Sequence, residues 1–150
     1  MFLLDTDYAV LLQRGDSEEL RRLLERMSAY PDSDFYYPVI SFHEQMLGAN
    51  AYVSRATQPR DVVRGYAMLH QILADFSAAQ VLTFDEAAAR TFEELRKQRV
   101  RVGTMDLRIA SIALSRDITV LTRNLVDFQQ VPGLRVEDWT TAARRMTNDE

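Results

Sequence analysis

Residues 103–114 read GTMDLRIASIAL, and this stretch predicts a helix that lies against the core of the protein. Ile109, Ala110 and Leu114 recur at the spacing of one helical face, which is typical of a buried apolar stripe. Asp106 falls on the same stripe, although a carboxylate in an apolar core is costly. We therefore expect the first turn of this helix to face a cleft and the rest of it to face the core.

On both sides of this helix, short apolar or β-branched runs alternate with helical patterns. The expected strands are 2–5, 35–40, 80–84 and 118–122, with 134–139 as a short fifth. The expected helices are one capped by Thr6 or Asp7 that runs to about residue 14, then 17–30, 41–53, 57–80 and a helix that starts at Asp85. This alternation predicts an α/β fold with a mostly parallel sheet and helices on both faces, and the helices within 41–53 and 57–80 form a hairpin.

The size and composition of the chain limit the kinds of protein that it can be. At 150 residues, we expect 1–150 to form a single domain. The chain contains no cysteine, which excludes disulfides and thiolate metal sites. No apolar run approaches the ~18 residues of a membrane span, and the first residues lack the basic segment of a signal peptide. We therefore expect a cytoplasmic protein.

The net charge of −4 does not exclude a nucleic-acid partner. Four acids gathered in one metal-holding cluster would account for the whole negative balance. Seventeen of the 18 basic residues are arginine, whose planar guanidinium suits bidentate contacts with phosphate. A general preference for arginine over lysine explains the same count equally well.

Acidic and amide side chains follow several of the expected strands. Asp5 closes the first strand, Glu44 lies about one helical turn beyond the second, and Asn124 and Asp127 follow the fourth. Asp106 can project over the same edge from the start of its helix. Because ligand sites of open α/β sheets form at the carboxyl ends of the strands, we expect these side chains to meet there.

Clustered carboxylates repel one another unless a cation lies between them. Oxygen ligands without cysteine or a histidine pair favour Mg²⁺ or Mn²⁺ over Zn²⁺. Such ions hold a phosphate and activate a water in the hydrolysis of phosphodiester bonds. The pattern therefore indicates metal-dependent hydrolysis of a phosphodiester bond.

Each of these side chains also has a purely structural interpretation. Glu44 fits a capping box with Ser41, and Asp106 can stabilise its helix by interaction with the helix dipole. Asp7 fits a helix cap, and Asp127 fits a cap on a turn. His43 and His70 are single histidines within helices, and we interpret both as ordinary helix residues, although His43 is beside Glu44 and could touch a substrate.

Four segments in series resemble the signature blocks of PIN-domain ribonucleases, and within that family most closely those of VapC-type toxins. They are FLLDTD (2–7), SFHEQMLGA (41–49), VGTMDLRIASIAL (102–114) and LTRNLVDFQQVPGLRVEDW (121–139). The resemblance extends over nearly the whole chain, in the family's order. It implies an α/β/α sandwich with a protruding helical hairpin, Mg²⁺- or Mn²⁺-dependent endonuclease activity on RNA, and neutralisation by a small VapB-like antitoxin, with a homodimer as a further expectation.

The resemblance also assigns roles to residues. The catalytic acids would be Asp5, Glu44 and Asp106. Of these, Asp5 and Asp106 would form the metal site. Asn124 occupies a position where many members of the family have aspartate, so a second metal would be held more weakly. Asp127 can take over part of that role, and the hydroxyl of Thr122 can position a water or a carboxylate.

Two other functions are compatible with parts of the sequence. The LLDTD segment also resembles the strand-end acids of haloacid-dehalogenase phosphatases and of response-regulator receivers, both of which use Mg²⁺. Both need a lysine near the site, and the only lysine, Lys97, lies in what we interpret as an exposed helix end. The other alternative is a PIN-like protein that binds RNA or a partner without cutting, which the neutral Asn124 supports.

The hairpin within 41–78 has more apolar residues than the packing of its two helices needs, which indicates a partner surface. The residues in question are Met46, Tyr52, Val63, Tyr66, Met68, Leu69 and Phe76. The alternative is that they only pack the two helices together.

Overall fold

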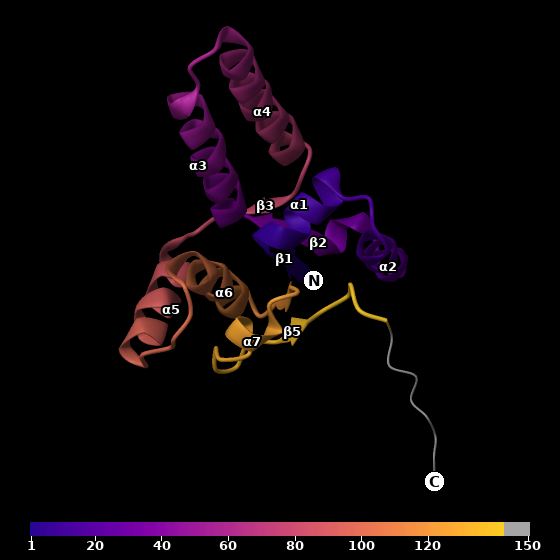
Figure 1. Ribbon diagram of the computed structural model, residues 1–150. Helices are drawn as coiled ribbons and strands as arrows, with labels where there is room; N and C mark the ends of the chain where they lie inside the picture. The colour runs from indigo at the N-terminus through magenta and orange to yellow at the C-terminus, as the bar shows by residue number, and fades with distance from the viewer. Residues whose placement is uncertain (143–150) are drawn as a thin grey trace.

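The computed structural model describes residues 1–142 and contains one five-stranded sheet (Figure 1). The strands are β1 (Phe2–Leu4), β2 (Phe35–Pro38), β3 (Val81–Leu82), β4 (Thr119–Leu121) and β5 (Val136–Glu137). Their order across the sheet is β3-β2-β1-β4-β5, and all four neighbouring pairs are parallel. The predicted α/β fold with a parallel sheet, including the short fifth strand, is therefore confirmed.

The central strand β1 is buried on both faces. Leu3 packs into one core with Ile109 and Phe128, whereas Phe2 and Leu4 pack into a second core with Tyr8. Side chains alternate across a strand, so three consecutive apolar residues serve two cores. This explains why the sequence of β1 is a continuous apolar run.

Helices cover the two faces of the sheet separately. One core is formed with α1 (Thr6–Arg14) and α2 (Glu18–Met27), and the other with α5 (Glu86–Lys97), α6 (Thr104–Arg116) and α7 (Leu125–Phe128). A short 3₁₀ turn, η1 (Asp32–Asp34), leads into β2. The apolar stripe of α6 is buried as predicted, from Leu107 to Ala113.

Helices α3 (Val39–Arg55) and α4 (Pro59–Ser77) form the predicted hairpin, which projects from the body of the molecule (Figure 1). Gly65 permits their close approach, since a Cβ atom at this position would lie 2.5 Å from Val53 Cγ2. No helix among residues 1–142 combines the length and the apolar character that crossing a membrane requires.

Two expected boundaries were wrong, and both errors affect the candidate site. The first helix is capped by Asp5, whose side chain accepts from the Tyr8 amide, and not by Thr6 or Asp7. The third helix begins at Val39 rather than at Ser41, because β2 ends at Pro38, whose fixed φ of −75° suits the residue before a helix.

Candidate active site

Asp5 lies immediately beyond β1 and is only 5% exposed. Its Oδ1 accepts a hydrogen bond of 2.9 Å from the Tyr8 amide, and its Oδ2 accepts one of 2.6 Å from the Thr122 hydroxyl. The prediction that Thr122 positions a carboxylate is therefore confirmed. Asp5 is thus held from two sides, by the first turn of α1 and by the residue that follows β4.

The pKa of Asp5 is raised to about 6. Burial is the largest cause, and the negative charges of Asp7 and Asp106 raise it further, against the lowering effect of the Thr122 and Tyr8 hydrogen bonds. A carboxylate in this condition is poorly solvated and repelled by its neighbours. It would gain stability from a cation.

Asp106 lies in the first turn of α6 and is half-buried. The pKa of its carboxyl group is raised, first by burial and then by the charges of Glu44 and Asp127. Within residues 1–142 its side chain accepts no hydrogen bond from another residue. Because these charges act on one another, Asp5, Glu44, Asp106 and Asp127 lie near the same edge of the sheet.

Glu44 lies in the second turn of α3 and does not form a capping box. Its Oε1 accepts a hydrogen bond of 2.8 Å from the hydroxyl of Thr6, which lies 2.9 Å from the Ser41 hydroxyl. Because α3 begins at Val39, Ser41 is already inside the helix and cannot cap it. Glu44 is instead oriented by α1.

Asn124 and Asp127 are bonded to each other. Asn124 Nδ2 donates to Asp127 Oδ2 over 2.8 Å, and the Asn124 backbone amide donates to the Thr122 hydroxyl over 2.9 Å. Asn124 stands at the cap position of α7 but makes no side-chain cap. Thr122 therefore connects this pair to Asp5 through one hydroxyl.

Sequence reasoning missed two groups that support this edge, Thr6 and Arg123. Arg123 donates two hydrogen bonds of 2.6 Å to the carboxylate of Asp7 and pairs with Glu19 of α2. Since Arg123 lies between Thr122 and Asn124, these bonds fix the segment after β4 to α1 and α2. The run TRN (122–124) gave no signal for Arg123, because its partners Asp7 and Glu19 lie far away in the sequence.

The geometry allows two carboxylates on one ion more readily than three. Within residues 1–142 there is no set of three histidine, cysteine or acidic side chains arranged to hold a metal ion. Asp5 and Asp106 are nevertheless close enough for the charge of Asp106 to raise the pKa of Asp5. Mg²⁺ needs only one or two protein carboxylates when water and phosphate complete its octahedron, so this donor set fits the ion.

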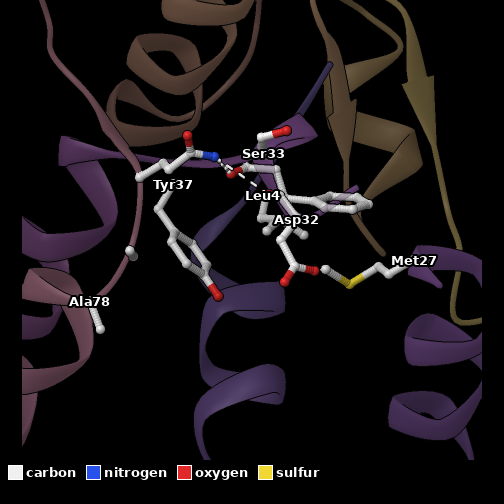
Figure 2. Close-up of a pocket in the computed structure, with 9 residues that line it drawn as sticks. Leu4, Met27, Asp32, Ser33, Tyr37 and Ala78 are labelled. Atoms are coloured by element: carbon white, nitrogen blue, oxygen red, sulfur yellow. Dashed lines mark hydrogen bonds between the residues drawn. The ribbon is translucent and has the colours of Figure 1, made fainter. Parts of the chain in front are cut away.

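A cavity of about 470 Å³ lies on the α2 side of the sheet, and none of the predicted site residues lines it. Figure 2 shows Tyr37 reaching into it from β2, with Asp32, Met27 and Ala78 around it. The lining is mostly apolar, and Gln80 closes part of it by donating to the Phe35 carbonyl over 2.9 Å. We therefore place the chemistry at the edge of the sheet that carries Asp5, Glu44, Asp106 and Asp127, which we call the acidic edge, and not in this cavity.

His43 and His70 lie on exposed faces of α3 and α4, in agreement with their interpretation as ordinary helix residues. Lys97 lies at the exposed end of α5, where its Nζ is 3.3 Å from Glu94. This exposed helix end is the position expected for Lys97 from the sequence. The phosphotransfer alternative needs a lysine near the site, so Lys97 gives it no support.

Several classes of α/β enzyme share a parallel sheet with acids at its carboxyl edge, and comparison with known proteins identifies the class of this one. The PIN domain family matches residues 2–134. The "tRNA(fMet)-specific endonuclease VapC" of Salmonella typhimurium is 30% identical over 92% of this chain and 97% of its own length. "Ribonuclease VapC1" of Rickettsia felis is 27% identical over 89% and 92%. The chain therefore belongs to the PIN-domain family, and within it to the VapC-type ribonucleases.

Solved structures show the same fold. The DNA-bound VapBC complex of Salmonella typhimurium contains a chain that is 30% identical, with a TM-score of 0.66 over 92% of this chain and 97% of that one. VapBC-1 of nontypeable Haemophilus influenzae has a TM-score of 0.70 at 24% identity, covering 93% and 98%. The predicted PIN-like fold is confirmed by these comparisons.

Proposed function

We propose that this protein is a divalent-metal-dependent endoribonuclease that acts as a toxin and is restrained by a cognate antitoxin. The observation that supports it most is that Asp5, which is 5% exposed, and the half-buried Asp106 lie at one edge of the sheet, and within residues 1–142 neither forms a salt bridge. Such a pair is unfavourable in isolation and becomes favourable around a cation. The relatives named as ribonucleases supply the class of substrate.

In this proposal Asp5 and Asp106 hold Mg²⁺ or Mn²⁺. When bound, the ion would polarise the phosphodiester and make a water more acidic. Thr122 and the Tyr8 amide keep the Asp5 carboxylate in one orientation. Glu44, oriented by Thr6, contributes a third carboxylate that can accept a proton from an attacking water.

The Asn124–Asp127 pair borders the same edge. Asn124 brings an oxygen without a charge, and its amide nitrogen is already bonded to Asp127. We propose that this pair orients a water or a substrate phosphate rather than holding a second ion by itself. A second ion would need oxygens from the RNA.

The test is cleavage of a panel of structured RNAs, including transfer RNA, with Mg²⁺, with Mn²⁺ and with EDTA. We expect defined cuts with either metal and none with EDTA. Binding of the same RNAs without any cut under all conditions would favour the alternative of a non-cleaving RNA-binding protein. An Asp106→Asn variant should bind RNA without cutting it.

We also propose a VapB-like antitoxin and a homodimer as the partners of this chain. Two solved structures with the same fold are VapBC complexes. Apolar side chains are exposed along the hairpin, among them Val63 at 70%, Tyr66 at 60% and Leu73 at 60%. Co-expression with the neighbouring small open reading frame of its native operon should give a complex that does not cleave RNA.

A further inference from the structure

Five basic side chains gather where α5 ends and α6 begins. They are Arg96, Lys97, Arg99, Arg101 and Arg108, and we call them the basic corner. Residues 96–108 contain only one acid, Asp106, although the chain as a whole has a net charge of −4. Helices α5 and α6 pack side by side, so the end of α5, the loop after it and the start of α6 lie in one region of the molecule (Figure 1).

Local structure explains two of these five side chains but not the other three. Arg96 and Lys97 lie in the last turn of α5, where cations stabilise the helix dipole, and they approach Glu93 and Glu94 at 3.6 and 3.3 Å. Within residues 1–142, Arg99, Arg101 and Arg108 form no salt bridge with a carboxylate. Their charges are therefore available to a ligand.

The backbone at Arg99 indicates that its side chain is not there for stability. Its φ is 55°, and its amide and that of Val100 bond back to Arg96 and Leu95 over 3.0 and 3.3 Å. This is the helix-ending motif in which the left-handed position is usually glycine. An arginine at this position costs stability, so a role of its side chain outside the fold explains its presence better.

Two arginines of the basic corner, Arg96 and Arg108, pack against the aromatic ring of Phe92. The guanidinium carbons of Arg96 and Arg108 lie 5.7 and 5.8 Å from the centre of the Phe92 ring. Both arginines and Thr104 line a hollow of about 390 Å³ whose lining is largely polar. Positioned guanidinium groups around a polar hollow are suited to phosphate oxygens.

One residue of the basic corner, Arg108, lies on α6, the helix that also carries Asp106 of the acidic edge. Thr104 and Arg108 flank Asp106 in sequence and face α5, whereas Asp106 faces the other acids. The two faces are separated by about one helix diameter, ~10 Å. We propose that the basic corner binds the phosphate backbone of the RNA strand on one side of the bond that is cut. This inference rests on the proposed ribonuclease function, because it assigns the substrate's path to that site.

The experiment compares two variants with the same change of charge. Arg99→Gln with Arg101→Gln removes two charges from the corner, and Arg21→Gln with Arg90→Gln removes two that pair with Glu18 and Glu86 elsewhere. Binding to transfer RNA and to a short single-stranded oligouridylate is measured by fluorescence anisotropy at several salt concentrations. Asp106→Asn is added to every protein, with EDTA, so that the RNA stays intact.

We expect the affinity of the Arg99→Gln/Arg101→Gln variant for RNA to fall tenfold or more. The slope of the logarithm of the association constant against the logarithm of the salt concentration should fall in magnitude by about 1.4, because two phosphate contacts are lost and each contributes about 0.7. The Arg21/Arg90 control should keep the slope. Equal slopes for the two double variants, or no RNA binding by the parent protein, would overturn the proposal. If the protein binds RNA through the basic corner but cuts none of the RNAs tested, the proposed ribonuclease function is rejected and the proposed RNA-binding role of the corner stands.

A third variant separates binding from folding. Arg99→Gly removes the strained backbone as well as the charge, so Tm should rise by about 2–4 °C while RNA affinity falls. Asp117→Gly is its control, because Asp117 has the same φ of 55° at the end of α6. RNA affinity unchanged by Arg99→Gly would count against a contact at this residue.

Discussion

Asp5 caps α1 and is also our proposed metal ligand, and Asp5→Asn separates the two roles. Asparagine caps a helix as well as aspartate does, so the bond from the Tyr8 amide can persist. Loss of the desolvated charge should raise the free energy of unfolding in EDTA at pH 7–8 by about 1–3 kcal/mol. Cleavage should fall at least ~100-fold. Urea unfolding and RNA cleavage measure the two effects, and full activity of the variant would refute the metal site.

The same carboxyl group predicts how stability depends on pH. The pKa of Asp5 in the folded protein, about 6, lies above the ordinary aspartate value of 3.8, so the folded state binds the proton more tightly than the unfolded state does. In EDTA, the stability of the parent protein relative to Asp5→Asn should therefore increase as the pH falls from about 7 towards 4. Saturating Mg²⁺ should flatten this dependence. A stability difference that stays constant over this pH range would contradict the raised pKa.

Asn124 and Asp127 can be tested as a pair. Asn124→Asp replaces the 2.8 Å hydrogen bond to Asp127 by two facing carboxylates. The metal-free variant should be less stable, and it should need less Mg²⁺ for half-maximal cleavage because a charge is added near the ion. Titrations of cleavage rate against Mg²⁺ measure the second effect.

The single-residue variants Asp127→Ala and Asn124→Ala complete this comparison. If Asp127 replaces the family's aspartate, its loss should reduce cleavage more than the loss of Asn124. Cleavage by Asp127→Ala at the parental rate would make Asp127 a turn residue only.

The elements of the fold bring the site residues together, and Thr6 is the contact between α1 and α3. Thr6→Val removes the hydroxyl that bonds Glu44 over 2.8 Å but keeps the shape of the side chain. Loss of such a supporting bond should lower kcat by about 10–100-fold, with little change in RNA affinity. Thr6→Ser should restore the rate. A rate that valine leaves unchanged would mean that Glu44 does not depend on α1.

The order and type of the elements could be predicted from the sequence, because strand and helix periodicities are strong signals in an α/β chain. The acids at the ends of β1 and β4 could be predicted too, since a parallel sheet gathers such positions at one edge. The contacts of Glu44 could not, because they depend on where α3 begins. The motif at Ser41 fits a capping box, and only the tertiary structure shows that Pro38 ends the strand first. Arg123 was missed because its partners lie 116 and 104 residues away.

For the molecule as a whole, the hairpin remains the predicted association surface. Four residues of the predicted set pack in the apolar cluster between α3 and α4, namely Met46, Met68, Leu69 and Phe76. Val63 and Tyr66 of that set are exposed, and so is Leu73, which the prediction did not include. Val63→Glu with Leu73→Glu should leave Tm unchanged within a few degrees and lower the molar mass measured by light scattering, if copies of this chain associate there. Gln71→Glu, on the same helix, is the control. A monomer in both the parent and the variant would reject the homodimer.

The position of β1 at the centre of the sheet has a consequence for the nascent chain. A ribosome makes Asp5 117 residues before Thr122, whose hydroxyl orients the Asp5 carboxylate. At about 5–20 residues per second, roughly 6–23 s of translation separate the two. Until then β1 has no neighbour on one side, because β4 has not yet been made. A chain that stops before β4 therefore cannot assemble the acidic edge, so any cutting has to wait until the ribosome has made Thr122.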